Sequence, residues 1–271
     1  MAVELKRVNS KTNPGRRLKE GNMNFIKLIK LNGLAKLWLS RGKVNALNGE
    51  VVAELRNTLL ALENDPPTRA IILSGSGKFF SFGFDIPEFF SFSKDDFRNF
   101  LRQFTGLYYY MFLYPKPIVA ALNGHAIAGG CMLALSCDER LMVSGKAKIS
   151  LNEIGFGSSV FAGSAEMLKY CVGGENASKI LYSGALFNAG EAKALGLVGE
   201  VVPEKNLDAM ATEIASNLGN KSNRAFASIK SLLRKSIAEK MKEKEEDSIS
   251  EFIDIWYSES TRRNLENIKI Y

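Results

Sequence analysis

Residues 116–132, KPIVAALNGHAIAGGCM, decide the fold of this chain. Pro117–Leu122 is apolar and short, which predicts a strand, and small residues lead from it into an apolar helix expected from about Gly129 to Ser136. A turn between a strand and a helix points several backbone N–H groups at one small volume, where the helix N-terminus is partly positive. Such a turn is suited to hold a negatively charged oxygen.

One carboxylate, Glu153, follows this turn by about twenty residues, in the sequence Leu151-Asn152-Glu153. A base beside an oxyanion site can remove a proton next to a carbonyl group, so the pair of features suggests proton transfer. The alternative is a structural one, in which the carboxylate caps a helix or pairs with an arginine. The spacing alone leaves both roles open.

Length and composition restrict the class of protein. The chain has 271 residues, of which 46% are apolar, enough for one large domain or two small ones. Since it has neither a membrane-length apolar run nor a secretion signal, we expect a cytoplasmic protein that does not bind a membrane. Cys131, Cys137 and Cys171 have no paired spacing, which favours free thiols in a reducing compartment.

The positive charge is concentrated at the N-terminus. Residues 1–22 contain six basic and two acidic residues, so they carry +4 of the net charge of +7 and the rest of the chain only +3. With Asn13-Pro14-Gly15 and little periodicity, this segment is predicted to be a disordered basic tail. A nucleic-acid-binding arm is the alternative, but a compact domain at +3 does not resemble a phosphate-reading surface.

Strands and helices are predicted to alternate, which indicates an α/β fold with mostly parallel pairing. The predicted strands are Phe25–Leu31 and Leu34–Leu39, joined by Asn32-Gly33, then Ala70–Leu73, Pro117–Leu122 and Arg140–Val143. Further helices are predicted at Gly49–Glu63, Ser93–Tyr114, Ala162–Val172, Ala177–Tyr182, Ala189–Leu195 and Asn206–Leu218, and from Lys221 to the end. Within the last helical region, Ala238–Asp247 is expected to be a solvated face, and Phe252, Ile255, Trp256 and Leu265 an apolar contact strip.

Three segments in this order resemble the crotonase (enoyl-CoA hydratase/isomerase) family. They are KFFSFGFDI at 78–86, the segment 116–138, and ASKILYSGALFNAGEAKALGLVGEVV at 177–202. The resemblance implies a crotonase-like α/β spiral of ββα units over residues 23–205 and a C-terminal helical oligomerisation region over residues 206–271. It also implies homotrimers, often stacked into hexamers, and an acyl-CoA thioester as the substrate.

The resemblance also implies roles for individual residues. The thioester carbonyl would lie between the backbone N–H groups of Phe84 and Gly129, and Glu153 would be the catalytic base. Hydratases of the family have a second glutamate, whose position is occupied here by Met132. Phe161 stands where many hydratases have glycine and would line the acyl pocket. Asp85 would stabilise the first loop at the pocket.

The departures from the hydratase pattern favour the family's Δ3,Δ2-enoyl-CoA isomerases, which keep only the second glutamate. Gly83-Phe84-Asp85-Ile86 also resembles their first loop, whereas hydratases commonly have alanine before the aspartate. We therefore predict isomerisation of 3-enoyl-CoA to trans-2-enoyl-CoA. No metal or other cofactor is implied, because CoA is part of the substrate, and exposed basic residues such as Lys78 would meet its phosphates.

Two alternatives remain open at this point. One is another crotonase chemistry, namely a hydratase, hydrolase or decarboxylase. The other is a non-catalytic scaffold that binds acyl-CoA or RNA. His125 is the chain's only histidine and is expected to have a packing or hydrogen-bonding role, and Glu88 is expected to be solvated.

Overall fold

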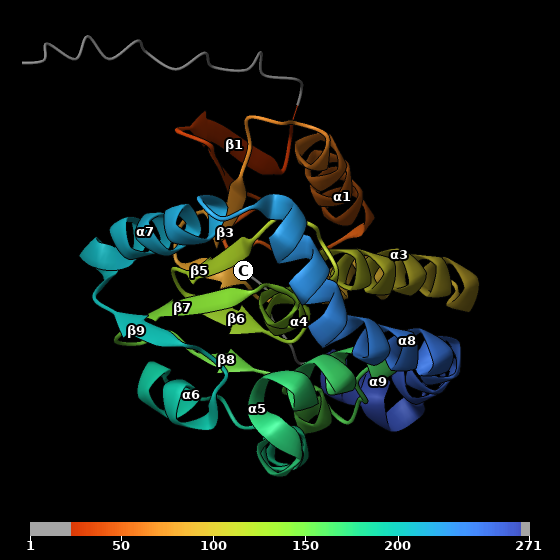
Figure 1. The fold of residues 1–271 in the computed structure, drawn as a ribbon. Helices are drawn as coiled ribbons and strands as arrows, with labels where there is room; N and C mark the ends of the chain where they lie inside the picture. The colour runs from red at the N-terminus through yellow and green to blue at the C-terminus, as the bar shows by residue number, and fades with distance from the viewer. Residues whose placement is uncertain (1–22, 267–271) are drawn as a thin grey trace, which may run out of the picture.

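The computed structural model describes residues 23–266 of the chain (Figure 1), so the predicted tail over residues 1–22 lies outside the described residues. The described part opens with an antiparallel hairpin of β1 (Ile26–Leu31) and β2 (Leu34–Leu39). Asn32 and Gly33 form its two-residue turn with φ values of 51° and 80°. A type I′ turn needs a positive φ at both positions, which explains why the Asn-Gly prediction is confirmed.

The strands after the hairpin alternate between two sheets. In residues 23–266 the larger sheet has the order β1-β2-β3-β5-β7-β9 and the smaller one the order β4-β6-β8, and every pair except β1/β2 is parallel. The larger sheet is completed by β3 (Ala70–Gly75), β5 (Ile118–Leu122), β7 (Glu139–Val143) and β9 (Glu200–Val202). The smaller consists of β4 (Phe79–Ser81), β6 (His125–Ile127) and β8 (Ile149–Ser150).

Each turn of the chain therefore adds one strand to each sheet before a helix returns it to the larger sheet. This is the predicted crotonase-like spiral of ββα units. The helices that close the turns are α1 (Gly49–Glu63), the short α2 (Ile86–Phe89) with α3 (Lys94–Phe112), α4 (Gly129–Ser136), and α5 (Ala162–Ser183) with α6 (Ala189–Leu195). Two 3₁₀ turns, η1 (Glu153–Phe156) and η2 (Glu204–Asn206), link further elements.

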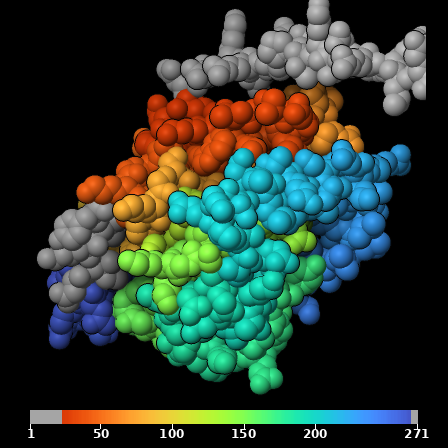
Figure 2. Space-filling model, turned by 90° about the vertical axis from the view of Figure 1, so that its left-hand side faces the viewer, coloured from red at the N-terminus to blue at the C-terminus, as the bar shows by residue number. Residues whose placement is uncertain are grey.

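The C-terminal helices divide between two sides of the molecule. α7 (Leu207–Gly219) packs on β2, β3, β5 and β7 of the larger sheet, and Figure 2 shows it (light blue) below the N-terminal hairpin (red). α8 (Asn223–Trp256) and α9 (Glu259–Leu265) lie with α3 on the opposite side (Figure 1). α7 thus packs directly on the larger sheet of the spiral core, although the sequence analysis grouped it with the C-terminal helical region.

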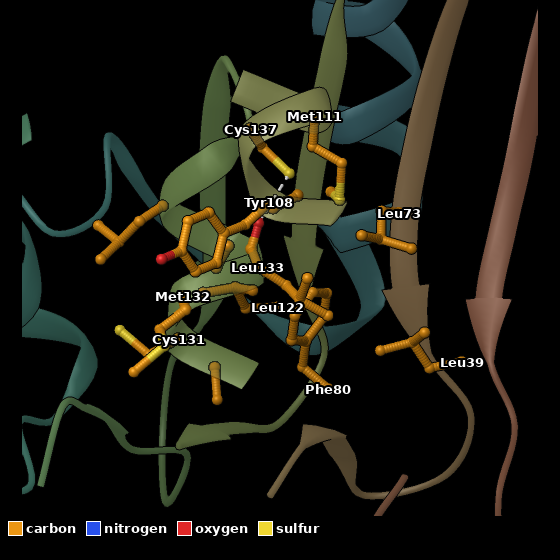
Figure 3. Close-up of a cluster of buried hydrophobic side chains, with 14 of the residues drawn as sticks. Leu39, Leu73, Phe80, Tyr108, Met111, Leu122, Cys131, Met132, Leu133 and Cys137 are labelled. Atoms are coloured by element: carbon orange, nitrogen blue, oxygen red, sulfur yellow. Dashed lines mark hydrogen bonds between the residues drawn. The ribbon is translucent and has the colours of Figure 1, made fainter. Parts of the chain in front are cut away.

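The core lies where α3 and α4 meet the strands. Figure 3 shows Tyr108 and Met111 of α3 and Met132 and Leu133 of α4 in one cluster with Leu39 and Leu73 of the larger sheet and Phe80 of the smaller one. All of these side chains are buried. The apolar helix that the sequence predicted from about Gly129 to Ser136 is confirmed as α4, and all of its residues are buried.

The two helices predicted at Ala162–Val172 and Ala177–Tyr182 are confirmed as the two arms of α5, which are separated by a kink at Gly173, whose φ of 78° is not helical. Other predictions need correction. The face Ala238–Asp247 is not wholly solvated, because Glu245 is half-buried. Cys131 and Cys137 are buried free thiols, whereas Cys171 is only half-buried. Among the helices of residues 23–266, none combines the length and apolar character that crossing a bilayer requires.

Candidate active site

The first loop leaves one backbone donor unused. Its neighbouring N–H groups all bond within the protein: Phe82 donates to the Val44 carbonyl at 2.9 Å, Gly83 to Ser81 Oγ at 3.1 Å and Asp85 to the Leu47 carbonyl at 3.0 Å. Among the described residues, the N–H of Phe84 has no protein acceptor. Since a backbone N–H away from bulk water is nearly always paired, this donor is available to a ligand.

The second turn presents its donors by means of a strained residue. Ala128, at the N-cap of α4, has φ 49° and ψ −118°, a conformation that costs a residue other than glycine about 1–3 kcal/mol. Its own N–H donates to the Ser150 carbonyl at 2.8 Å, and its carbonyl accepts the first helical bond, from Met132 at 3.0 Å. Gly129 is therefore the first helical residue, and its N–H has no acceptor inside the helix.

The two loops touch at glycine positions, where a side chain would crowd the opposite loop. A Cβ on Gly83 would lie 3.1 Å from the Gly129 nitrogen, and a Cβ on Gly129 would lie 3.0 Å from the Phe84 ring. At Gly130 a Cβ would approach the Ser81 carbonyl oxygen to 2.4 Å. The absence of side chains at these glycines lets the two loops that carry the Phe84 and Gly129 N–H groups approach closely.

Glu153 reaches the same place through the smaller sheet. Strand β8 pairs with β6 in the register Ile127↔Ser150, so η1 and its first residue Glu153 follow just beyond the Ala128 turn. The side chain is buried, with 4% of the residue exposed, and its Oε2 has no hydrogen-bond partner. Burial without a cation nearby raises the pKa of Glu153 to about 8.

This geometry does not match the structural role that the sequence left open for Glu153. Among the described residues no arginine or lysine pairs with it, and it does not cap a regular α-helix. The next residue, Ile154, is 50% exposed and does not contribute to this burial. With this raised pKa, the buried carboxyl group of Glu153 holds a proton near neutral pH and can exchange it, as general acid–base chemistry requires.

A cavity of about 190 Å³ connects these groups. Phe84, Gly129, Met132, Glu153 and Phe161 all line it, so five of the six predicted site residues come together. The remaining lining residues are Phe82, Ile86, Ile127, Ala128, Asn152, Phe156, Phe252 and Trp256. Most of the wall is apolar or aromatic, which suits an acyl chain.

Asp85 is the exception among the predicted pocket residues, since it does not line this cavity. Its carboxylate accepts a hydrogen bond from the Glu88 N–H at the start of α2 and pairs with Arg41 at 2.5 Å. Arg41 also pairs with Glu88 at 3.0 Å, so Glu88 belongs to an ion-pair network rather than being simply solvated. Asp85 thereby fixes the loop that follows Phe84.

A second, more open cavity of about 740 Å³ adjoins the first, and Phe82 lines both. Three exposed lysines, Lys27, Lys43 and Lys78, contribute to its wall. Lys78 was the candidate from the sequence, whereas Lys27 and Lys43 were missed because they come from β1 and the loop after β2. His125 packs its ring against Phe79 of this wall, with the ring centroids 5.0 Å apart, and burial lowers its pKa.

Comparison with known proteins assigns the chain to a family. The profile of the family "Enoyl-CoA hydratase/isomerase" matches residues 30–268. This chain belongs to the enoyl-CoA hydratase/isomerase family. The family includes both hydratases and isomerases. The chain is therefore an enzyme of this family, and an acyl-CoA substrate is consistent with that membership.

Family members of both kinds are similar to it. A crotonyl-CoA hydratase of Syntrophomonas wolfei is 35% identical over 196 residues, which is 72% of this chain and 75% of that protein. The mitochondrial enoyl-CoA delta isomerase 1 of Rattus norvegicus is 29% identical over 86% of this chain and 81% of its own length. The crystal structure of the human mitochondrial delta3-delta2-enoyl-CoA isomerase matches with a TM-score of 0.85 and 26% identity, covering 90% of this chain and 96% of that one.

Two polar atoms at this family site escaped the sequence analysis. Trp256 Nε1 and Asn152 Oδ1 are buried without hydrogen-bond partners, and both residues line the cavity with Glu153. Trp256 was expected only as part of an apolar strip, and it is indeed buried. No pattern in the sequence distinguishes an indole that packs against a core from one that also faces a ligand cavity.

Proposed function

We propose that the protein isomerises 3-enoyl-CoA to trans-2-enoyl-CoA, with Glu153 as the only proton shuttle. Glu153 removes a proton from C2 of the acyl chain, and the electron pair moves into a dienolate whose oxygen accepts hydrogen bonds from the Phe84 and Gly129 N–H groups. The same carboxyl group then returns the proton to C4. One base suffices because both carbons present the same face of a planar dienolate.

The observation that supports isomerisation is the composition of the cavity wall. Of the described residues that line it, Glu153 alone is ionisable, and Met132 takes the place of a second acid. Addition of water needs a held nucleophile as well as a proton source, whereas moving a double bond needs only a proton carrier. A thioether cannot exchange a proton, so the site suits the second reaction better.

The two backbone donors would supply much of the rate enhancement. An oxyanion-hole donor is worth about 2.7–4 kcal/mol of transition-state stabilisation in a site that excludes water. Both donors here are held before any substrate arrives, one by the strained Ala128 and the other by the hydrogen-bonded residues on either side of Phe84. No reorganisation is then needed when charge develops on the thioester oxygen.

The adjoining open cavity would accommodate the CoA part of the substrate. Lys27, Lys43 and Lys78 place positive charge there, and phosphates carry the complementary charge. The connection through Phe82 would let the pantetheine arm pass from this cavity to the acyl pocket. No metal or redox cofactor takes part in the proposed reaction.

Self-association, as a homotrimer or a stacked hexamer, forms part of the proposal. α8 exposes an apolar row of Ile229, Leu232 and Leu233, which are 58%, 83% and 58% exposed. Adjacent exposed apolar side chains on one helix are typical of a surface that another protein covers. Light scattering after size-exclusion chromatography measures the mass, and a monomer at assay concentration would contradict this part. A cytoplasmic location likewise stays a prediction.

The reaction is tested by assaying the purified protein with 3-hexenoyl-CoA and with crotonyl-CoA. We expect isomerisation of the first and slow hydration of the second, and Glu153→Gln should abolish the isomerisation. Glu166→Gln, which removes a half-buried carboxylate paired with Lys169 outside the cavity, is the matched control and should keep full activity. Fast hydration of crotonyl-CoA by the wild type would make the protein a hydratase. If Glu153→Gln behaves as the wild type does in both assays, this result would favour a non-catalytic scaffold.

A further inference from the structure

Three helices meet at the carboxylate of Glu245, away from the proposed reaction centre. Glu245 of α8 accepts a hydrogen bond from the Tyr108 hydroxyl of α3 and another from the Gly163 N–H of α5, the latter at 2.7 Å. Three residues further along α8, Ser248 Oγ accepts from the Ala162 N–H at 3.0 Å. Side chains of α8 therefore hold the first turn of α5.

α5 depends on these outside acceptors because it lacks its own. Its N-cap is Phe161, whose side chain cannot accept a hydrogen bond, and its first turn contains no acidic residue. The first N–H groups of a helix need acceptors, and negative charge is favoured there. The fit is tight: a Cβ on Gly163 would lie 2.5 Å from the Tyr108 oxygen and 2.7 Å from Glu245 Oε2.

The same junction leads directly to the walls of the acyl pocket. Phe161 precedes the held turn, and its ring lies 4.6 Å from that of Phe252, which follows Glu245 by two helical turns on α8. On α3, Phe104 lies one turn before Tyr108, and its ring is 4.9 Å from Phe84, the residue with the unpaired N–H. Glu245 is thus connected to the pocket through both α5 and α3.

We propose that Glu245 is a positioning residue that fixes Phe161 as the end wall of the acyl pocket and thereby sets the acyl chain length that the protein accepts. The proposal rests on the proposed binding of an acyl chain in this cavity, but not on which reaction follows. Glu245 touches no substrate atom. It acts by anchoring the residue that does.

The test is the binding of saturated acyl-CoA thioesters, from butanoyl-CoA through octanoyl-CoA to dodecanoyl-CoA, measured by calorimetry. Phe161→Ala removes the wall and should favour long chains over butanoyl-CoA. Glu245→Ala should shift the chain-length profile in the same direction by a smaller factor. The quantity compared is the ratio of the affinities for dodecanoyl-CoA and butanoyl-CoA. In the double variant, the change in this ratio should be smaller than the product of the two single-variant changes by about threefold or more, as expected for coupled residues.

Matched variants separate positioning from a general loss of structure. Glu246→Ala removes the neighbouring carboxylate, which pairs with Arg102 at 2.8 Å on the surface, and should leave the profile unchanged. Glu245→Gln keeps one acceptor oxygen and should restore part of the wild-type profile. If Glu245→Ala does not fold, Tyr108→Phe removes one of the two hydrogen bonds to Glu245 and should give a weaker shift of the same kind.

Two results would overturn the inference. One is a wild-type chain-length profile in folded Glu245→Ala, or in Tyr108→Phe if that variant has to replace it. The other is a double variant whose ratio equals the product of the single ones. Absence of acyl-CoA binding by the wild type would instead refute the proposed function, and the inference with it, so the two failures can be told apart.

Discussion

Replacing Glu153 by glutamine should change how the stability of the fold depends on pH. Burial raises the pKa of Glu153 from 4.5 in a solvated chain to about 8 in the folded protein. Between these values the unfolded chain has lost the proton while the folded chain still holds it. The folded state then binds more protons, so the free energy of unfolding falls as pH rises through this window. The stabilising contribution of Glu153 to the free energy of unfolding is therefore fully present below pH 4.5 and is lost by about pH 8.

The size of the effect follows from the shift. At 1.36 kcal/mol per pKa unit, the difference between 4.5 and about 8 amounts to about 5 kcal/mol, of which about 3 kcal/mol is already lost at pH 7. Solvent screening takes little away, because only 4% of the residue is exposed. Glutamine has a similar shape and no proton to lose, so the variant should gain stability relative to wild type by this amount as pH rises.

The assay is urea unfolding of both proteins at one protein concentration, from about pH 5 to about pH 9, followed by circular dichroism. The variant should be inactive yet more stable at alkaline pH, and the two curves should converge in acid. Glu166→Gln should follow the wild-type curve throughout. Parallel curves for wild type and Glu153→Gln across the whole range would refute the argument, since they would show that Glu153 is not desolvated in the folded protein.

Further predictions concern the reaction itself. The kcat/KM for 3-hexenoyl-CoA should rise with pH and level off above about pH 8, because only the ionised Glu153 accepts a proton; a plateau already reached in acid would contradict this. Met132→Glu should gain hydration of crotonyl-CoA, measured by loss of enoyl absorbance, and no gain would show that a second acid there cannot hold water. Gly129→Ala should lower kcat by about 10²–10³, because its Cβ would lie 3.0 Å from the Phe84 ring and force the two donors apart; unchanged kcat would refute that role. Lys43→Ala and Lys78→Ala should raise KM in a salt-dependent way without lowering kcat, which steady-state kinetics at two ionic strengths checks.

Local patterns in the sequence were sufficient where neighbours in the chain determine the structure. The bounds of α1, α4 and α6 and the β1/β2 turn agree with the prediction. Asn48 and Asn188 cap α1 and α6 by accepting from backbone N–H groups three residues ahead, which is a short-range signal. The motifs around Phe84 and Gly129 likewise indicated the family without any knowledge of distances.

Short strands and shared helices were not predictable in this way. β4, β6 and β8 contain only two or three residues each and exist because they pair with one another across the spiral. Glu245 lies in a stretch of mixed charge that is typical of a solvated face. Its contacts with Tyr108 and Gly163 join residues 137 and 82 positions away in the chain. Periodicity cannot reveal such partners.

The sequence by itself determined which residue types are present at the site: one carboxylate, a methionine where a second acid could stand, and glycines where two loops meet. Only the tertiary structure decided their chemical state. Ala128 adopts a positive φ, the N–H groups of Phe84 and Gly129 are left without acceptors within residues 23–266, and Glu153 is removed from water, all because distant segments pack around them. Hydrogen-bond pairing and desolvation depend on every neighbour in space, and a linear pattern contains only the neighbours along the chain.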